Sequence, residues 1–360
     1  MLYSYLTSLS LAFSDSYFLQ VIFRLSFIFI TAFLIAYFGI KSFICFVHKK
    51  NNLYQPIRSD GIKTHIAEKQ KTPTMGGLFI IAGTLIASVL FANIKNNYVL
   101  IALFVMISFS AIGFVDDYLK VAKHNTKGFR GSIKLVIQFT IVSLVMFFLQ
   151  MTNNVYFNGA VEIPFTKLAI DLGIFYVFFA TFVIVGAANA VNLTDGLDGL
   201  VSVPAIITLS CFAFIIYATS NPTISNHLGI LNIENTAGLI MFCAAMIGAI
   251  LAFLKFNLKP AKIFMGDVGS LGIGASLGVL AIILKKELLF GIIGLLFVIE
   301  AVSVILQVGS YKLRQKRIFL MAPIHHHFEK LGWSEIKVVR TFWLTSAICA
   351  GVGMLSFFVK

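Results

Sequence analysis

Long apolar runs are the feature of this sequence that most restricts its fold. About 20 apolar residues cross the hydrocarbon core of a bilayer as a helix, and the 360-residue chain contains ten runs of roughly that size. We therefore expect an all-α polytopic integral membrane protein with about ten transmembrane helices, forming one domain over residues 1–360. The runs cover approximately residues 18–47, 75–92, 97–115, 132–150, 169–189, 200–218, 236–255, 270–284, 288–309 and 338–358.

Composition excludes the soluble classes of protein. Hydrophobic residues make up 59% of the chain and charged residues only 12%, whereas soluble domains have about 45–50% and 25%. The net charge of +13 suits anionic lipid or phosphorylated ligands. Nucleic acid is not an expected partner, because the sequence has no soluble basic domain. All four cysteines lie inside apolar runs, which indicates neither a disulfide framework nor a zinc site.

The basic residues between the runs predict an orientation. If successive loops alternate between the two sides, one side carries 21 Lys and Arg residues and the other carries five. The positive-inside rule makes the richer side cytoplasmic, so both termini should face the periplasm. On the periplasmic side, Asn158-Gly159 within residues 155–165 favours a small β-hairpin with a type I′ turn.

The polar residues that could carry chemistry gather in the expected cytoplasmic loops. Asp116 and Asp117 close the third run, and Lys120 lies one helical turn from Asp116. Two carboxylates at a helix C-terminus oppose the helix dipole, so they need a cation or a function in compensation. From these residues alone, a solvated helix end with one ion pair is an equally good interpretation.

A second polar segment joins the fifth and sixth runs without any basic residue. Asn189, Asn192, Asp195 and Asp198 recur every three residues, so they could line one helical face. Such a density of carboxamide and carboxylate groups indicates a site for a sugar, a nucleotide or a metal. An ordinary polar turn is the alternative.

The loop after the seventh run places Asp267 just before a predicted helix. At a helix N-terminus this carboxylate could bind a metal or cap the helix, and the nearby backbone N–H groups attract phosphate. Phe264 could stack on a base, although aromatic residues at a membrane surface are also common interfacial anchors.

Three further features could contribute to a site. His325, His326 and His327 lie in the most basic loop, and consecutive histidines suit phosphate contacts better than the coordination of one metal. Thr74 opens the second run at another helix N-terminus that could receive a phosphate. Glu300 lies within an apolar run, where an acidic group is either functional or a structural group paired inside the bundle.

Together these residues predict phosphoryl transfer at one face of an apolar bundle. Carboxylates with few nitrogen ligands favour Mg²⁺, which is usually held by one or two carboxylates and substrate oxygens. Metal and cationic groups would stabilise the transferred phosphate, and a carboxylate would take a proton or position the nucleophile. An apolar groove beside the site would admit a lipid co-substrate.

Several motifs make the chain similar to a known family. Asp116-Asp117, residues 192–199 (NLTDGLDG) and residues 265–267 (MGD) resemble features shared by the polyprenyl-phosphate N-acetylhexosamine-1-phosphate transferases. Residues 72–77 (TPTMGG) and 323–329 (PIHHHFE) resemble the bacterial branch that uses a muramoyl-pentapeptide donor. The resemblance covers essentially the whole length.

This resemblance implies the activity. It implies Mg²⁺-dependent transfer of phospho-MurNAc-pentapeptide from UDP-MurNAc-pentapeptide to undecaprenyl phosphate. The products would be lipid I and UMP, in the first membrane step of peptidoglycan synthesis. It also implies a multi-pass enzyme of the bacterial inner membrane, and a homodimer.

The resemblance further implies residue roles. Asp267 would bind Mg²⁺, with Asp116 and Asp117 as further candidate metal ligands. Asp116 would deprotonate the lipid phosphate for direct attack on the β-phosphorus, and Asp117 would assist. Phe264 would stack on uracil, and the histidines would contact the pyrophosphate or the sugar phosphate. The expected substrate contacts are Lys69, Thr74, Lys120, Lys134, Asn189, Asn192, Asp195, Asp198, Asn257, Phe264, His325, His326 and His327.

Two other functions are weighed against this one. A sister transferase that uses UDP-GlcNAc would keep the aspartates, but residues 325–328 disfavour it, and competition between the two donors would decide. A secondary transporter should place ionisable groups near the bilayer midplane, whereas nearly all of them here lie towards one face.

Overall fold

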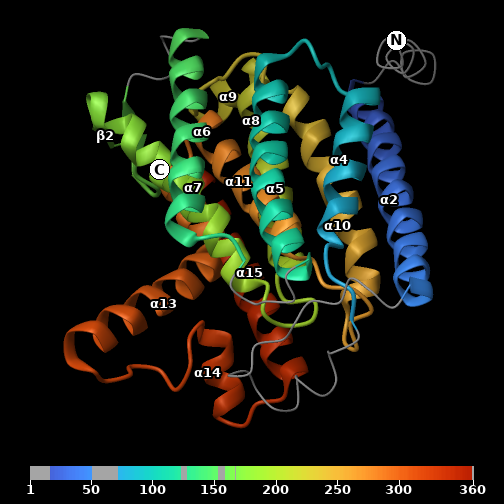
Figure 1. Ribbon diagram of the computed structural model, residues 1–360. Coiled ribbons are helices and arrows are strands. Elements are labelled where there is room, and N and C mark those ends of the chain that lie inside the picture. The colour runs from blue at the N-terminus through green and yellow to red at the C-terminus, as the bar shows by residue number, and fades with distance from the viewer. Residues whose placement is uncertain (1–16, 51–71, 123–127, 153–158, 167, 359–360) are drawn as a thin grey trace.

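The computed structural model is a bundle of long helices (Figure 1), described here for residues 17–50, 72–122, 128–152, 159–166 and 168–358. Its long helices are α2 (Tyr17–Lys50), α4 (Gly77–Phe91), α5 (Asn97–Ala122), α6 (Gly131–Thr152), α7 (Tyr176–Thr194), α8 (Ser202–Ser220), α10 (Gly238–Asn257), α11 (Asp267–Ile283), α13 (Leu295–Arg314) and α15 (Glu335–Phe358). Short elements join them: β1 (Ala160–Glu162), β2 (Ala169–Asp171), η1 (Gly173–Phe175), α9 (Pro222–Leu228), α12 (Glu287–Ile293) and α14 (Ile324–Lys330).

Among the described residues, eight helices are long and apolar enough to cross a membrane. Helices α4 and α11 are apolar but shorter. Eight of the ten predicted runs each coincide with one helix. The run at 169–189 begins in β2 and η1 before it enters α7, and the run at 288–309 is divided between α12 and α13. The chain is therefore a multi-pass membrane protein of predominantly helical structure.

Helix α11 forms the centre of the bundle, between α5 and α7 (Figure 1). Every residue from Val268 to Ile283 is buried. Glycines permit this close packing, because a Cβ atom on Gly274 would lie 2.6 Å from the carbonyl oxygen of Ala187 in α7. Such a contact is too short for any side chain, so small residues let the backbones of α7 and α11 touch.

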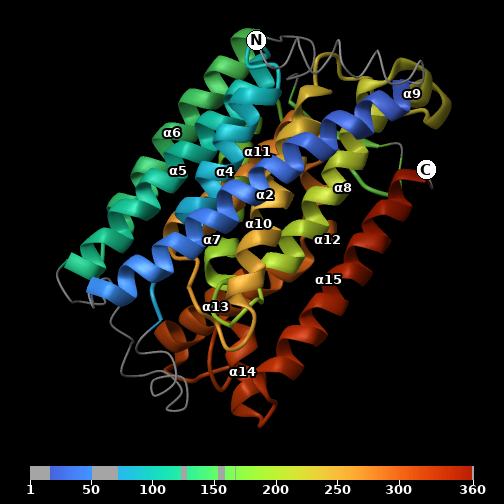
Figure 2. The same ribbon diagram turned by 90° about the vertical axis from the view of Figure 1, so that its right-hand side faces the viewer.

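The segments that carry the predicted site residues lie on one side of the bundle. The C-terminal ends of α5 and α7 and the helix α14 lie in the lower half of Figure 1, whereas the β-hairpin lies in the upper half. Figure 2 shows that α2 begins and α15 ends towards the upper side. The described parts of the predicted cytoplasmic segments therefore lie on the same side of the bundle.

The hairpin is present, but its predicted turn was wrong. Strands β1 and β2 pair antiparallel, with Val161 opposite Ile170, so the connection runs through residues 163–168. Gly159 precedes the first strand and accepts a hydrogen bond from the N–H of Leu172. Asn158 lies outside the described residues. The turn falls at Pro164, which has no N–H to give to a ladder and so favours the end of a strand.

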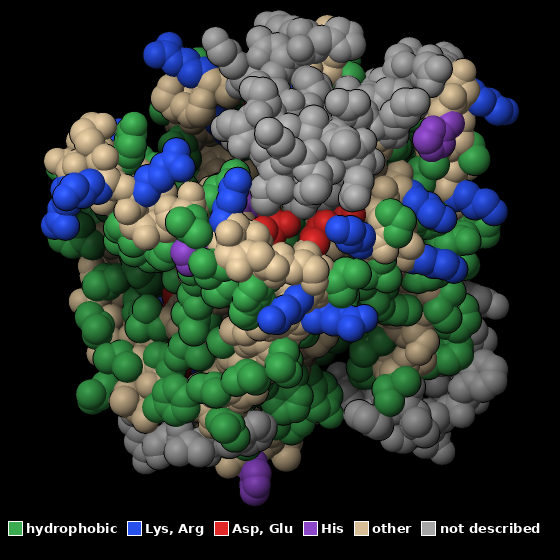
Figure 3. Space-filling model, turned by 90° about the horizontal axis from the view of Figure 1, so that it is seen from below, with side chains coloured by type: hydrophobic (Ala, Val, Ile, Leu, Met, Phe, Trp, Pro, Cys, Tyr) green, Lys and Arg blue, Asp and Glu red, His purple; other side chains and the backbone are tan. Residues whose placement is uncertain are grey.

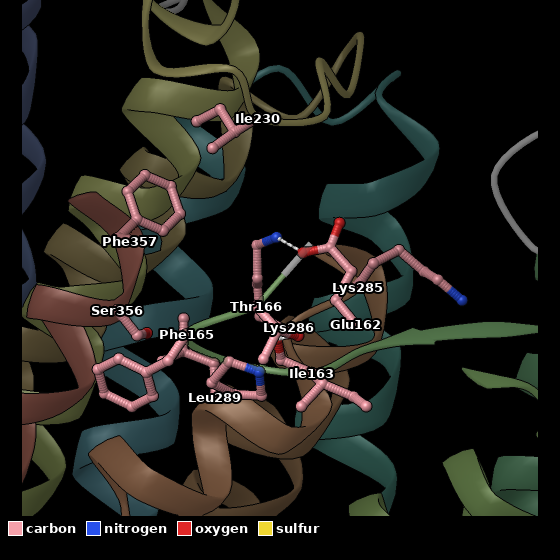
Figure 4. Close-up of a pocket in the computed structure, with 11 residues that line it drawn as sticks. Glu162, Ile163, Phe165, Thr166, Ile230, Lys285, Lys286, Leu289, Ser356 and Phe357 are labelled. Carbon is pink, nitrogen blue, oxygen red and sulfur yellow. Dashed lines mark hydrogen bonds and ion pairs between the residues drawn. The ribbon is translucent and has the colours of Figure 1, made fainter. Parts of the chain in front are cut away.

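An ionic cluster fixes the hairpin to the end of α11. The Lys286 ammonium pairs with the Glu162 carboxylate of β1, and this pair lines a pocket with Ser356 and Phe357 of α15 (Figure 4). The neighbouring Lys285 side chain extends away from the pocket (Figure 4); its Nζ lies 3.7 Å from the centre of the Tyr176 ring. The hairpin, α11 and the start of α7 are thereby connected on the side opposite α14.

Candidate active site

Three aspartates meet where the last turns of α5 approach the start of α11. One carboxylate oxygen from each of Asp116, Asp117 and Asp267 lies within 4.8 Å of the others. Gly113 makes this approach possible, because a Cβ atom there would lie 2.2 Å from the carbonyl oxygen of Asp267. The N–H of Val268 donates to Asp117 at 3.1 Å, so the helix N-terminus is capped across the interface.

Two lysines lie among these carboxylates. The Lys120 Nζ is 2.5 Å from Asp116 and 3.5 Å from Asp267. The Lys134 Nζ, from the first turns of α6, is 2.6 Å from Asp267. Both lysines were predicted as substrate contacts, and the structure brings both to the aspartate cluster. Their ammonium groups offset part of the repulsion between carboxylates that are almost buried.

The donor set of the cluster fits a hard divalent cation. The candidate ligands are the carboxylate oxygens of three aspartates, and Mg²⁺ prefers oxygen ligands. Asp117 Oδ1 is buried and accepts no hydrogen bond from the described residues, although the Lys120 Nζ lies 3.7 Å away, so this oxygen is available to a metal ion. The Asn192 amide nitrogen donates to Asp267 at 2.9 Å and to the Ser270 hydroxyl at 2.8 Å. Asn192 thus orients Asp267 within the cluster.

The segment before α4 closes the cluster from another direction. The N–H of Phe264 donates to the carbonyl of Pro73, and the N–H of Gly76 donates to the carbonyl of Phe264. Thr74 is consequently buried, with a hydroxyl that has no hydrogen-bond partner among the described residues. A Cβ atom on Gly266 would lie 2.4 Å from Asp117 and 3.2 Å from the Thr74 hydroxyl, so Thr74 belongs to the same site.

Asp198 and Asn257 are buried and hydrogen-bond to backbone groups. Asp198 accepts from the N–H of Ala261, whereas Asn257 accepts from the N–H of Gly199 and donates to the carbonyl of Ile263. These bonds join the loop after α7 to the loop after α10. Both residues were expected to contact substrate, and the structure gives them hydrogen bonds that fix loops.

Glu335, at the start of α15, reinforces this loop junction. One of its carboxylate oxygens accepts the N–H of Asp198 at 3.0 Å, and the other lies 2.7 Å from the Lys259 Nζ. Trp343, two turns along α15, donates its indole N–H to the carbonyl of Gly199. Sequence analysis missed Glu335, Lys259 and Trp343, because none belongs to a motif. The predicted run began at residue 338, so Glu335 lay outside it, whereas the structure places Glu335 in the first turn of α15.

Asn189 is held away from the aspartates. Its amide nitrogen donates to Gln138 of α6 at 2.9 Å and to the carbonyl of Val185 at 2.8 Å. Gln138 is fully buried and was also missed, since a single glutamine in an apolar run carries no motif. The pair joins α6 to α7 next to Lys134.

The three histidines have three different surroundings. His325 is fully buried, with Nδ1 against Glu300 of α13. The His326 ring has Nδ1 at 2.8 Å from Glu329, and the His327 Nδ1 accepts the N–H of Leu320. The His325 and His326 rings are adjacent, with centroids 4.1 Å apart, but each of the three histidines has a different Nδ1 partner.

The remaining predicted residues lie around this site. Asp195 ends α7 and Phe264 precedes α11, and both side chains are half-buried. Lys69 lies outside the described residues. Figure 3 views the molecule from the side of these segments, and acidic side chains are visible near the centre of the face, with Lys and Arg side chains around them.

Comparison with known proteins gives the class. A family model described as Glycosyl transferase family 4 matches residues 99–285, which include Asp116, Asp117 and Asp267. A second model, Phospho-N-acetylmuramoyl-pentapeptide-transferase signature 1, matches residues 69–81. The aspartate cluster and the Thr74 segment thus fall within the two matched regions. They define a membrane-embedded glycosyl transferase of family 4.

Two curated relatives resolve the class further. The phospho-N-acetylmuramoyl-pentapeptide-transferase of Orientia tsutsugamushi (strain Ikeda) is 46% identical over 361 aligned residues, 99% of each chain. The protein of the same name from Rickettsia bellii (strain OSU 85-389) is 50% identical over 304 residues, 84% of each chain. The chain belongs to the phospho-N-acetylmuramoyl-pentapeptide-transferase family.

Proposed function

We propose that this protein transfers phospho-MurNAc-pentapeptide from UDP-MurNAc-pentapeptide to undecaprenyl phosphate, forming lipid I and UMP. The observation that carries the proposal is the convergence of Asp116, Asp117 and Asp267 with two lysines, in a chain with a full-length relative of that name. The match to signature 1 favours this donor over UDP-GlcNAc. The clustering of ionisable groups at one end of the bundle disfavours a transporter.

Mg²⁺ is the proposed cofactor. Asp267 would hold the ion, with Asp116 and Asp117 as the other candidate ligands, because their oxygens lie within 4.8 Å of one another. When bound, the ion would neutralise phosphate charge and polarise the phosphoryl group. Asn192 and Lys134 orient the Asp267 carboxylate also without the ion.

Asp116 is the proposed general base. One of its oxygens accepts the N–H of Phe129 and the other faces Lys120, so the carboxylate is held in a fixed orientation. It would take the proton of the lipid phosphate, whose oxyanion then attacks the β-phosphorus of the donor directly. Fixed orientation of the reacting groups is a large part of phosphoryl-transfer catalysis.

Helix α6 provides an approach for the lipid acceptor. Lys134 is followed directly by Leu135 and Val136, whose side chains are exposed on the outside of the bundle. With Phe139 they line an apolar depression on α6. A polyprenyl chain on this surface would bring its phosphate to Lys134, at the aspartate cluster. An apolar surface that ends at a cation suits an anionic lipid.

The enzyme is proposed to lie in the bacterial inner membrane with this site on the cytoplasmic side and both termini in the periplasm. The distribution of 21 against five basic residues supports this orientation. It would give the site access to a cytoplasmic nucleotide sugar. A homodimer is proposed by family analogy.

The decisive experiment is product formation by purified protein in detergent. UDP-MurNAc-pentapeptide and undecaprenyl phosphate are supplied with Mg²⁺ or with a chelator, and UMP and the lipid product are measured together. We expect equal amounts of both products, and only with the metal. Turnover with UDP-GlcNAc alone would assign the sister reaction, and no turnover with either donor would refute a transferase.

A further inference from the structure

Glu300 is a fully buried acid within α13 that the reaction outlined above does not use. Its side chain has no exposed surface, and among the described residues its carboxylate pairs with His325, which is equally buried. The His325 Nδ1 lies 3.1 Å from each of the two carboxylate oxygens. A carboxylate removed from water is costly unless it is paired and hydrogen-bonded. His325 therefore supplies the hydrogen-bonding partner that the buried Glu300 carboxylate needs.

The opposite edge of the His325 ring faces the loop after α7. Its Nε2 is buried without a hydrogen-bond partner among the described residues. A Cβ atom on Gly196 would lie 2.3 Å from this nitrogen, so the ring is in direct contact with the loop backbone. Gly196 itself is exposed. The imidazole thus extends from a buried carboxylate to a loop that lies on the surface of the candidate site.

The surrounding packing fixes this arrangement. Leu197 and Leu200 of the loop share a hydrophobic cluster with Val338 and Phe342 of α15, and Ile324 and Phe328 of α14 pack against it. Helix α14 and the loop after α7 therefore pack against the same cluster.

The other two histidines differ from His325. The His326 partner, Glu329, lies on the same short helix, and the His327 partner is a backbone N–H. His325 is joined to a carboxylate from a different helix, Glu300 of α13. A carboxylate at one ring nitrogen fixes the orientation and the tautomer of an imidazole, and so sets the state of the other nitrogen.

We propose that Glu300 is a positioning residue for the transfer reaction. It holds His325 by Nδ1 and thereby directs Nε2 at the Gly196 backbone, in the loop after α7 that carries the proposed donor contacts Asp195 and Asp198. The inference rests on the proposed function, since it concerns how that site is held. Glu300 touches no substrate in this arrangement and acts only through His325.

Three variants test the arrangement. Glu300→Gln retains the size of the side chain but removes the charge that fixes the tautomer. His325→Asn retains an N–H near the position of Nδ1, for Glu300, but removes the Nε2 edge. The double variant combines both changes. The measurements are kcat and KM for the UDP-linked donor, and the melting temperature in detergent. Ser303→Ala is the matched control, because Ser303 is a buried residue one turn away on α13 whose hydroxyl donates to the backbone carbonyl of Glu300 and not to its carboxylate.

We expect each single variant to lose about tenfold or more in kcat/KM for the donor. The double variant should be no worse than His325→Asn alone, within about twofold, because both changes remove the same effect. Ser303→Ala should remain within about twofold of the wild type. Melting temperatures of the active preparations should agree to within about 2 °C for His325→Asn and the wild type.

Two results would overturn the proposal. One is a double variant whose loss equals the product of the two single losses, since Glu300 would then act independently of His325. The other is full activity of His325→Asn, which would remove any need for the Nε2 edge and decides the matter even if Glu300→Gln fails to fold. A wild type without transfer activity refutes the proposed function itself, and is recognised before any variant is made.

Discussion

Asp267 is the residue on which the aspartate cluster depends most, because side chains from three other helices or turns meet its two oxygens. Lys134 contacts Oδ2, whereas Lys120 and Asn192 contact Oδ1. Each partner comes from a different helix: α6, α5 and α7. The Asp267 carboxylate thus joins α11 to three other helices, and it is also the proposed ligand of Mg²⁺.

Replacing Asp267 by Asn should lower kcat by roughly a hundredfold or more, because a metal ligand and the partner of two cations are lost together. The cap of α11 is kept, because the N–H of Val268 bonds to Asp117, and an amide at position 267 can still accept hydrogen bonds from Lys134 and Asn192; the protein should therefore still fold. Turnover and Mg²⁺ affinity are measured on the same detergent preparation. Asp171→Asn, an equal change on the exposed strand β2, is the control; near-normal turnover of Asp267→Asn would exclude its role.

Sequence analysis identified the site residues that stand in contiguous motifs, and the structure brings three of them together. It missed the residues whose contacts are with distant segments. Asp116, Asp117 and Asp267 were found because adjacent acids and glycines are conspicuous between apolar runs. Glu335 and Gln138 are isolated polar residues, and their partners lie 137 and 51 positions away. A local sequence pattern cannot predict contacts between residues so far apart in the chain.

Glu335→Gln tests the loop junction. The amide can still accept the N–H of Asp198 but cannot form the ion pair with Lys259, so the two loops should be held less firmly. We expect KM for the UDP-linked donor to rise about threefold to tenfold with little change for the lipid, since a buried ion pair is lost. Steady-state kinetics with each substrate varied in turn provide the measurement. An equal rise for both substrates would contradict a role confined to the donor loops.

At the scale of elements, α11 is held at both of its ends. Asp267 fixes its first turn, and Lys286, just beyond its last turn, pairs with Glu162 of the hairpin. The apolar run of this helix was predictable, but its neighbours were not. The hairpin illustrates the limit: Asn158-Gly159 is a strong local turn signal, yet the pairing of Val161 with Ile170 places the turn beyond it.

Glu162→Gln should lower stability and leave catalysis unchanged. Without the carboxylate, the Lys286 ammonium, which is almost buried, loses its ionic partner, and an unpaired buried charge is destabilising. We expect the melting temperature in detergent to fall by about 2–5 °C, at unaltered kcat. Glu234→Gln removes the same charge from an exposed outer loop and should not change the melting temperature. Equal shifts in both variants would indicate an effect of net charge alone.

At the scale of the whole molecule, polarity is distributed asymmetrically along the bundle. The C-terminal ends of α5 and α7 and the helix α14 lie on one side of the bundle, and the hairpin lies on the other (Figure 1). The basic residues follow the same division, so the side proposed to bind phosphates is also the side that the positive-inside rule assigns to the cytoplasm. Charge in the loops can thus both orient the chain during insertion and attract an anionic donor.

This orientation predicts which surfaces a membrane-impermeant thiol reagent can reach. Starting from a variant without its four cysteines, Thr166→Cys places a thiol in the exposed hairpin connection, and Lys316→Cys places one in the exposed segment between α13 and α14. In right-side-out spheroplasts we expect labelling at 166 only, because the charged reagent cannot cross the hydrocarbon core. After permeabilisation both positions should react, which controls for intrinsic accessibility. Labelling of 316 in intact spheroplasts would show the opposite orientation. The aspartate cluster would then face the periplasm, without access to a cytoplasmic nucleotide donor, and both the proposed topology and the proposed reaction would be contradicted.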